Sequence, residues 1–177
     1  MKKLNLLKTF ALMCAVLVAA GFSALADGPG TNATAIRVTT GNAFALVPTS
    51  DPNVFGHPVD GVAQVSAVGN CHFHGDATIY LPTSAGQPIR IVSASPWTLT
   101  SSDGANSLKF NAVGTATFDP ANPLFANLTY QVTFVGGTGK FAGATGTGTM
   151  DVTAEFTSQL AGLATWTLKG VVITPGF

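Results

Sequence analysis

The histidines are the residues of this chain whose type and spacing most readily suggest chemistry. All three fall within positions 57–74, as His57, His72 and His74. On a β-strand, His72 and His74 would point to the same face about 7 Å apart, and two imidazoles at that spacing can bind one metal ion. A third ligand would come from His57, Asp60 or Asp76.

The sequence around the histidine pair does not complete such a metal site. A cupin-type site would need a glutamate a few residues after the pair and a later histidine. Thr78 and Ile79 stand there instead, and no histidine follows His74. We therefore favour no metal site, keep His72, His74 and His57 as candidate ligands, and expect the pair to face solvent.

The neighbouring cysteine suggests a different chemistry. The run Asn70-Cys71-His72 places a thiol beside an imidazole, the two groups that a nucleophilic cysteine requires. Adjacent strand residues point to opposite faces, so Cys71 and His72 cannot pair directly on a regular strand. We expect Cys71 to be buried as a small hydrophobic residue, on the same inward face as Phe73.

Two carboxylates, Asp151 and Glu155, share one face of a later segment with several threonines. On a strand they would lie about 13 Å apart, which is too far for a cooperating acid–base pair. The pattern predicts a solvated outer face.

Aromatic residues recur on the other face of the late segments. Stripes at strand spacing are typical of a core. If the interior is not fully packed, the same side chains would line a cavity, and their bulk and single hydroxyl would suit a small apolar ligand. The candidate cavity residues are Phe110, Tyr130, Phe134, Phe156 and Trp166.

The elements that must position these residues are β-strands. Apolar and polar residues alternate with a period of two in four late segments, 107–118, 125–135, 147–157 and 164–174. Less regular patterns predict earlier strands at 33–40, 42–48, 62–68, 72–81, 88–95 and 97–100. Residues 49–61 contain two prolines, Pro52 and Pro58, and predict a connection across one end of the fold. Asp103-Gly104 predicts a hairpin turn.

These patterns predict an all-β fold in one domain. About eight strands with short links fit an antiparallel barrel, with a β-sandwich as the alternative. We favour the barrel because the late strands are long and follow one another closely. Closing the sheet would also remove exposed strand edges, which this lightly charged chain has few other means to protect.

The first 26 residues have the composition of a signal peptide. Three lysines precede a short apolar run, and Ala24-Leu25-Ala26 is a suitable cleavage site. We therefore predict a signal peptide at 1–26 and a single β domain at 27–177, placed in the periplasm or outside the cell. The apolar run is too short to cross a membrane and no second one follows, so we expect no membrane span.

The charge of the remaining chain excludes several classes of protein. Without the three lysines of the leader, five basic residues stand against eight acidic ones. This balance argues against a nucleic-acid partner, and we expect no cofactor. Cys71 is the only cysteine left, so no disulfide can form within the mature chain.

A glycine-rich element joins two of the late strands. It runs from Gly136 to Gly148 and contains Gly-Gly-Thr-Gly-Lys-Phe-Ala-Gly at 136–143. We expect Gly136-Gly137 to end a strand, residues 139–143 to form a compact turn with Phe141 folded inward as a plug, and the last glycines to begin the returning strand. Lys140 precedes Phe141 and a threonine-rich strand, so the element lacks the sequence of a phosphate-binding loop.

At these residues the sequence resembles the allene oxide cyclase and dirigent-protein barrels, which carry a similar element between two late strands. It also resembles small exported bacterial proteins with the same element. The resemblance implies an eight-stranded antiparallel barrel with an apolar cavity. In the plant members that cavity holds a fatty-acid epoxide or a phenoxy-type radical. Those members are often oligomeric, so a homo-oligomer is an open alternative.

Three functions follow as expectations, in order of preference. The first is an exported barrel that binds a small hydrophobic or aromatic molecule, and a fully packed interior would contradict it. The second is a non-catalytic envelope or matrix protein that acts through its threonine-rich outer face. The third is a cyclase- or isomerase-like enzyme, which requires at least one buried ionisable group facing the cavity.

Overall fold

The structure is a computed structural model, and it describes residues 30–84, 87–119 and 121–176. The predicted signal peptide and its cleavage site lie outside the described residues. Within these ranges the chain forms strands and one 3₁₀ turn: β1 (Thr31–Ala45), β2 (Val47–Pro48), β3 (Val54–Val65), β4 (Gly69–Tyr80), β5 (Ile89–Ser93), β6 (Trp97–Ser101), β7 (Ser107–Asp119), β8 (Asn122–Thr138), η1 (Gly139–Phe141), β9 (Thr145–Phe156) and β10 (Ala161–Pro175). No helix in the described part of the chain is both long and apolar enough to cross a membrane.

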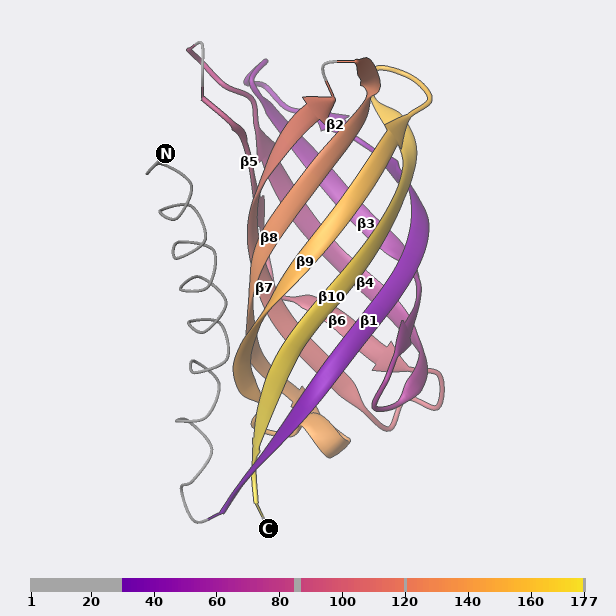
Figure 1. The fold of residues 1–177 in the computed structure, drawn as a ribbon, viewed down its shortest axis with the longest axis vertical. Coiled ribbons are helices and arrows are strands. Elements are labelled where there is room, and N and C mark those ends of the chain that lie inside the picture. The colour runs from indigo at the N-terminus through magenta and orange to yellow at the C-terminus, as the bar shows by residue number, and fades with distance from the viewer. Residues whose placement is uncertain (1–29, 85–86, 120, 177) are drawn as a thin grey trace, which may run out of the picture.

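The strands pair in an antiparallel ring (Figure 1). From β1 the ring passes through β10, β9, β8 and β7. The short strands β5 and β6 both bridge β7 to β4, and β4 pairs with β3. A short β3–β1 pairing then closes a ring of eight strand positions, one of which β5 and β6 share. The predicted all-β class is confirmed, and both the barrel and the sandwich fit this ring.

The alternating sequence explains which side of each strand faces inward. On β8, Tyr130, Val132 and Phe134 are buried, whereas Thr129 and Thr133 on the other face are exposed. Burial of the apolar set removes its surface from water, which fixes the register because a one-residue slip would turn that set outward. The late strands therefore enclose an apolar core behind a polar outer face.

Two glycines make room for aromatic rings inside the ring of strands. A Cβ on Gly75 would come within 2.3 Å of the Trp97 ring, and one on Gly114 within 2.6 Å of the Tyr130 ring. The indole Nε1 of Trp97 also donates a hydrogen bond to the backbone carbonyl of Asp76, at 2.8 Å. These strand positions need glycine because an aromatic ring lies directly against the backbone.

The glycine-rich element folds as the sequence predicts. After β8, η1 makes a single turn, and Phe141 points into the core and is buried. Gly139 and Gly143 adopt positive φ angles of 58° and 66°, which other residues rarely do. The side chain of Asn106 accepts a hydrogen bond from the backbone N–H of Lys140, at 2.8 Å. Phe141 thereby closes one end of the ring.

The first half of the chain departs from prediction in two places. The two expected strands at 33–40 and 42–48 are one continuous strand, β1, followed by the two-residue β2. The expected connection at 49–61 is wrong, because β3 already begins at Val54 and includes Pro58. At Pro58, β3 pairs with β4 only, so the missing N–H of proline does not interrupt a strand that is bonded on both sides.

Candidate functional site

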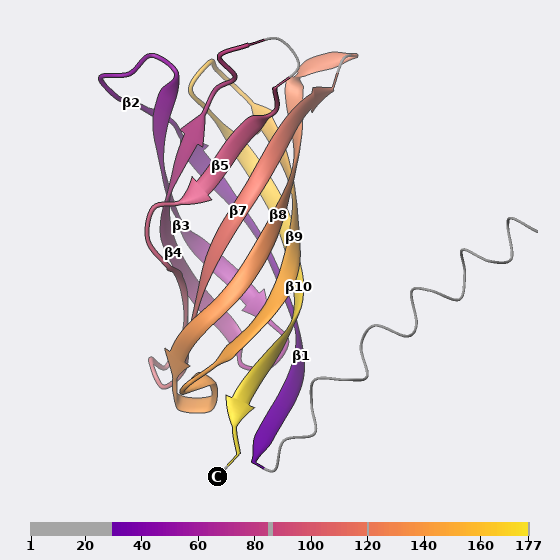
Figure 2. The ribbon, with the colours of Figure 1, turned by 90° about the vertical axis from the view of Figure 1, so that its left-hand side faces the viewer.

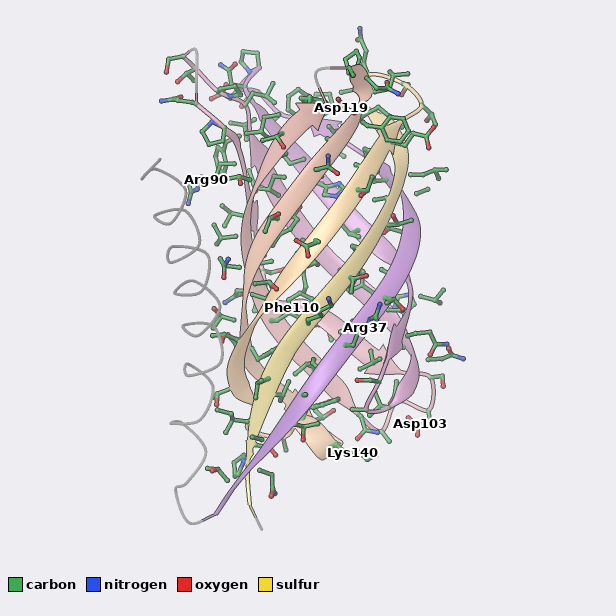
Figure 3. All side chains as sticks on the ribbon, viewed as in Figure 1. Arg37, Arg90, Asp103, Phe110, Asp119 and Lys140 are labelled. Atoms are coloured by element: carbon green, nitrogen blue, oxygen red, sulfur yellow. The ribbon has the colours of Figure 1, made fainter. Side chains whose placement is uncertain are left out.

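One end of the ring is hollow, and the other is filled. A cavity of about 200 Å³ lies at the end where β7 turns into β8 and β9 into β10. Figure 2 shows the connections that gather at this end. In Figure 3, Asp119 marks the same end, while Asp103 and Lys140 mark the opposite, closed end. Every long strand of the ring contributes to the wall, which is formed by Phe44, Leu46, Phe55, His57, Ile79, Leu81, Ile89, Ile91, Ala116, Phe118, Ala126, Leu128, Tyr130, Val152, Ala154, Phe156, Gln159, Leu160 and Ala164.

The chemistry of this wall is almost entirely apolar. No Asp, Glu, Lys or Arg side chain lines the cavity within the described ranges. The polar side chains in its wall are His57, Tyr130 and Gln159. Ligand sites commonly combine such an apolar wall with a few polar groups that orient the bound molecule.

The closed half of the interior is packed with aromatic rings. Phe73 lies 4.9 Å from Trp166 and stacks on Phe110 at 6.4 Å, measured between ring centroids. Phe110 in turn meets Phe134 edge to face at 6.3 Å and Trp97 at 5.8 Å. Offset and edge-to-face contacts of this kind are favourable. Because these rings fill the closed half, the cavity lies only at the other end.

The predicted cavity residues divide between the two halves. Tyr130 and Phe156 lie in the wall of the cavity. Phe110, Phe134 and Trp166 are buried but belong to the packed half rather than to this wall. Periodicity identifies which side chains point inward, but it does not show how far along the ring the interior is filled.

His57, like Gln159, is a polar residue of the wall whose place in the cavity the sequence pattern does not predict. Its side chain comes from β3 and packs edge to face against Phe44, with the ring centroids 5.7 Å apart. Its Nδ1 atom is shielded from solvent and has no hydrogen-bond partner among the described residues. Burial lowers the pKa of His57 below its ordinary value of 6.5, and a hydrogen bond to the backbone of Ala45 opposes that shift. The imidazole is therefore held in its neutral form.

A gap in the backbone pairing explains the position of His57. Strands β1 and β3 pair only from Val38 to Thr40, opposite Val65 to Ala63, and no pairs follow. Beyond this point the rings of Phe44 on β1 and His57 on β3 contact each other edge to face. Asn42 lies along the same stretch of β1, and its Oδ1 is also buried without a partner in the described structure. We call this unpaired stretch, β1 from Gly41 to Ala45 facing β3 from His57 to Val62, the β1–β3 seam.

Tyr130 supplies the second ionisable group of the cavity. It lies on β8 directly opposite Gly114 of β7, and its ring approaches Trp97 with centroids 6.1 Å apart. Burial raises the pKa of the Tyr130 phenol, so the hydroxyl stays protonated. His57 and Tyr130 thus provide the buried ionisable groups that the third expected function requires.

The other two histidines lie on the outside of the ring, as expected. His72 Nε2 lies 2.8 Å from one carboxylate oxygen of Asp60, and His74 Nδ1 lies 3.3 Å from the other. All three side chains are more than half exposed, and His57 is on the inner side of the ring. Within the described ranges no group of three or more His, Cys, Asp or Glu residues is arranged to hold a metal ion.

Cys71 and the carboxylates also occupy their predicted faces. Cys71 is buried, and burial raises the pKa of its thiol, with a smaller contribution from the charge of Asp103. A thiol in this state is a poor nucleophile. Asp151 and Glu155 are both exposed on β9, so the predicted solvated outer face is confirmed.

Comparison of the chain with protein-family models, with curated proteins and with solved structures found no match. The resemblance to the allene oxide cyclase and dirigent-protein barrels therefore stays a prediction.

Proposed function

We propose that this protein is exported and binds a small hydrophobic or aromatic molecule in the cavity at the open end of its strand ring. The observation that carries the proposal is a space of about 200 Å³ with an apolar wall beside a fully packed half. An engineered apolar cavity of about 150 Å³ is enough to bind benzene. The expected ligand is therefore of the size of one substituted ring.

The energetics of packing support a role for this space. Apolar cavities reduce stability by roughly 24 cal/mol per Å³, which is at most about 5 kcal/mol for a cavity of 200 Å³. The four alanines in the wall could accommodate larger side chains, and the packed half shows that this chain can fill its interior. An apolar ligand would recover part of that free energy on binding.

The predicted leader and the glycine-rich element agree with this proposal. A leader at 1–26 would deliver the chain to the periplasm or the medium. The element at 136–143 resembles the one in barrels whose interior holds an apolar substrate. Such a protein would act as a carrier or scavenger of its ligand without a metal or cofactor.

A cavity-filling substitution tests the proposal. Ala116 on β7 points into the cavity, while Thr115 next to it is exposed. We expect ethylbenzene to bind the wild type, with chemical-shift changes confined to residues of the cavity wall in a ¹H–¹⁵N NMR titration. Ala116→Leu should weaken binding at least about tenfold, because the added side chain occupies the ligand's space.

The control for that titration is Thr115→Leu, which adds an apolar side chain on the outer face of the same strand. It should bind ethylbenzene as the wild type does. If the wild type shows no saturable shifts at the cavity, or if Ala116→Leu binds as well as the control, the proposed function is wrong.

A specific observation favours one alternative, an envelope or matrix protein acting through its outer face. Thr39, Thr167, Asp151 and Thr129 stand in register across β1, β10, β9 and β8, and they border a shallow polar groove with Arg37 and Lys169. Loss of surface binding or self-association in Thr167→Lys, with ethylbenzene binding absent from the wild type, would favour this function.

A further inference from the structure

A second hollow adjoins the cavity where β5 and β7 cease to pair. Within the described residues, β5 pairs with β7 only as far as Ile89 opposite Ala116, whereas β7 continues to Asp119 with β8 beside it. Pro88 precedes Ile89, and proline rarely continues a strand that pairs on both sides, because it lacks an N–H. Figure 2 shows β5 and β7 side by side, and the hollow lies at the end of their contact. We call this hollow the β5–β7 notch.

The notch continues the apolar wall of the cavity. Four side chains line both hollows: Leu81, Ile89, Ala116 and Phe118. Within the described ranges no charged side chain lines the notch, and its polar side chains are those of Asn53, Gln87 and Thr117. A group that leaves the cavity past the four shared residues therefore moves from one apolar surface to another without meeting a charge.

Phe118 lies at the boundary between the two hollows. Its ring approaches that of Phe156 in the cavity wall, with centroids 5.8 Å apart, yet 46% of the Phe118 surface is exposed. Removing apolar surface from water is favourable. An apolar group lying in the notch would cover the exposed part of this ring, and the ligand would gain affinity from that contact.

The size of the cavity determines which part of a ligand would need the notch. The cavity measures about 200 Å³, and an apolar cavity of about 150 Å³ is enough for benzene. The space therefore holds one ring and a short substituent. A longer substituent must leave the cavity, and the notch gives it an apolar surface to lie against.

We propose that the β5–β7 notch is a second subsite, which binds an alkyl chain attached to the ring that occupies the cavity. The inference rests on the proposed function, since it extends the ligand class of the same cavity. The chain lies against Ile89 and Phe118, and its far end reaches water beside Gln87. The ligand class is thus a single ring that carries an alkyl chain.

The experiment compares two probes, ethylbenzene and 6-phenylhexan-1-ol, whose hydroxyl group can stay in water at the end of its chain. Dissociation constants are measured by NMR titration for the wild type, Thr117→Trp and Thr115→Trp. Thr117 lines the notch but not the cavity, so Thr117→Trp places an indole where the chain would lie. The matched control is Thr115, which is exposed on the same face of β7 and lines neither hollow.

The two variants should differ with one probe only. Each methylene removed from water contributes up to about fourfold to affinity, so displacing the chain from the notch should weaken 6-phenylhexan-1-ol at least about tenfold in Thr117→Trp. Ethylbenzene should bind Thr117→Trp within about twofold of the wild type, because its ring and short substituent stay in the cavity. Thr115→Trp should bind both probes as the wild type does.

A measurement on the wild type covers the case in which Thr117→Trp does not fold. Intermolecular NOEs from the chain of bound 6-phenylhexan-1-ol should reach Thr117 and Pro88, while NOEs from its ring should reach Tyr130. The inference is overturned if the chain gives NOEs only to residues outside the notch, or if folded Thr117→Trp binds 6-phenylhexan-1-ol as well as Thr115→Trp does. In both cases ethylbenzene still binds, so the proposed function stands. Absence of ethylbenzene binding to the wild type would instead overturn both.

Discussion

His57 makes the stability of the fold depend on pH. Burial lowers its pKa in the folded protein, whereas the unfolded chain takes up a proton as the pH falls through about 6.5. Below that pH the unfolded state binds more protons, so the free energy of unfolding decreases by up to about 1.4 kcal/mol per pH unit until the folded pKa is reached. We predict that the wild type loses stability between about pH 7 and pH 5.5, and that His57→Leu loses distinctly less, as measured by urea unfolding.

The matched control is the exposed His72. His72→Gln also removes one imidazole, but His72 lies on the outer face beside Asp60. Its loss should not reduce the decrease in stability between the two pH values. Parallel pH profiles for wild type and His57→Leu would show that the His57 imidazole is free to take up a proton in the folded protein.

The direction of these side chains could be predicted from the sequence, but their role could not. Strand parity correctly turned His72 and His74 outward and Cys71 inward. The place of His57 could not be predicted, because Pro52 and Pro58 made its strand look like a connection, and because that place depends on where β1 and β3 cease to pair. Parity also identified Tyr130 and Phe156 as inward residues. The packing of Phe110, however, involves Phe73 of β4, a strand that does not pair with β7, as well as Phe134 of the neighbouring β8.

Replacing a glycine in the glycine-rich element between β8 and β9 should reduce stability. The size of that loss depends on the space around the new Cβ as well as on φ. A Cβ at Gly139, with φ of 58°, would lie 2.3 Å from the carbonyl oxygen of Ala105. Gly104, in the β6–β7 turn, has a similar φ of 71° but open space around its Cβ position. We predict that Gly104→Ala costs about 1 kcal/mol of stability, and that Gly139→Ala costs at least about 2 kcal/mol.

Urea unfolding of the two variants separates the cost of a positive φ from the cost of the steric clash, because both variants place an alanine at a positive φ and only Gly139→Ala adds the clash. The difference between them reports the close approach of η1 to the start of β7. Equal losses would mean that η1 can move away from residues 105 and 106, and that Phe141 does not hold this end of the ring in place.

The glycine-rich element could be predicted because it lies between two of the regular late strands. Between Ser107 and Pro175 the strands are long, alternate cleanly and are joined by short links, so local sequence determines both extent and direction. In the first half, β2, β5 and β6 have five residues or fewer, and periodicity over so few residues is weak. Closure of the ring depends on the pairing of β3 with β1, and the alternation of residues within a single strand does not predict which strands pair.

At the scale of the whole molecule, the β1–β3 seam is where the ring should open most readily. The two strands share only three residue pairs, against twelve between β3 and β4. Backbone groups along the seam lack the pairing that slows hydrogen exchange elsewhere in a sheet. Amides of β1 from Gly41 to Ala45 that face β3 should therefore exchange faster than those of β8 near Val132.

A covalent link across the seam tests whether this opening limits stability. A Cβ on Gly61 would lie 3.3 Å from the Cβ of Asn42, close to the 3.5–4.5 Å of a disulfide. We predict that the oxidised double variant Asn42→Cys, Gly61→Cys is more stable than its reduced form by about 3 kcal/mol, since the bond closes a loop of similar length to those that give this value. The reduced form of the same protein is the control, and Cys71 does not compete because it is buried. Slower exchange on β1 after oxidation would show that its amides exchange when β1 and β3 separate at the seam. Unchanged exchange would show that these amides exchange by another route, and that the seam does not limit stability.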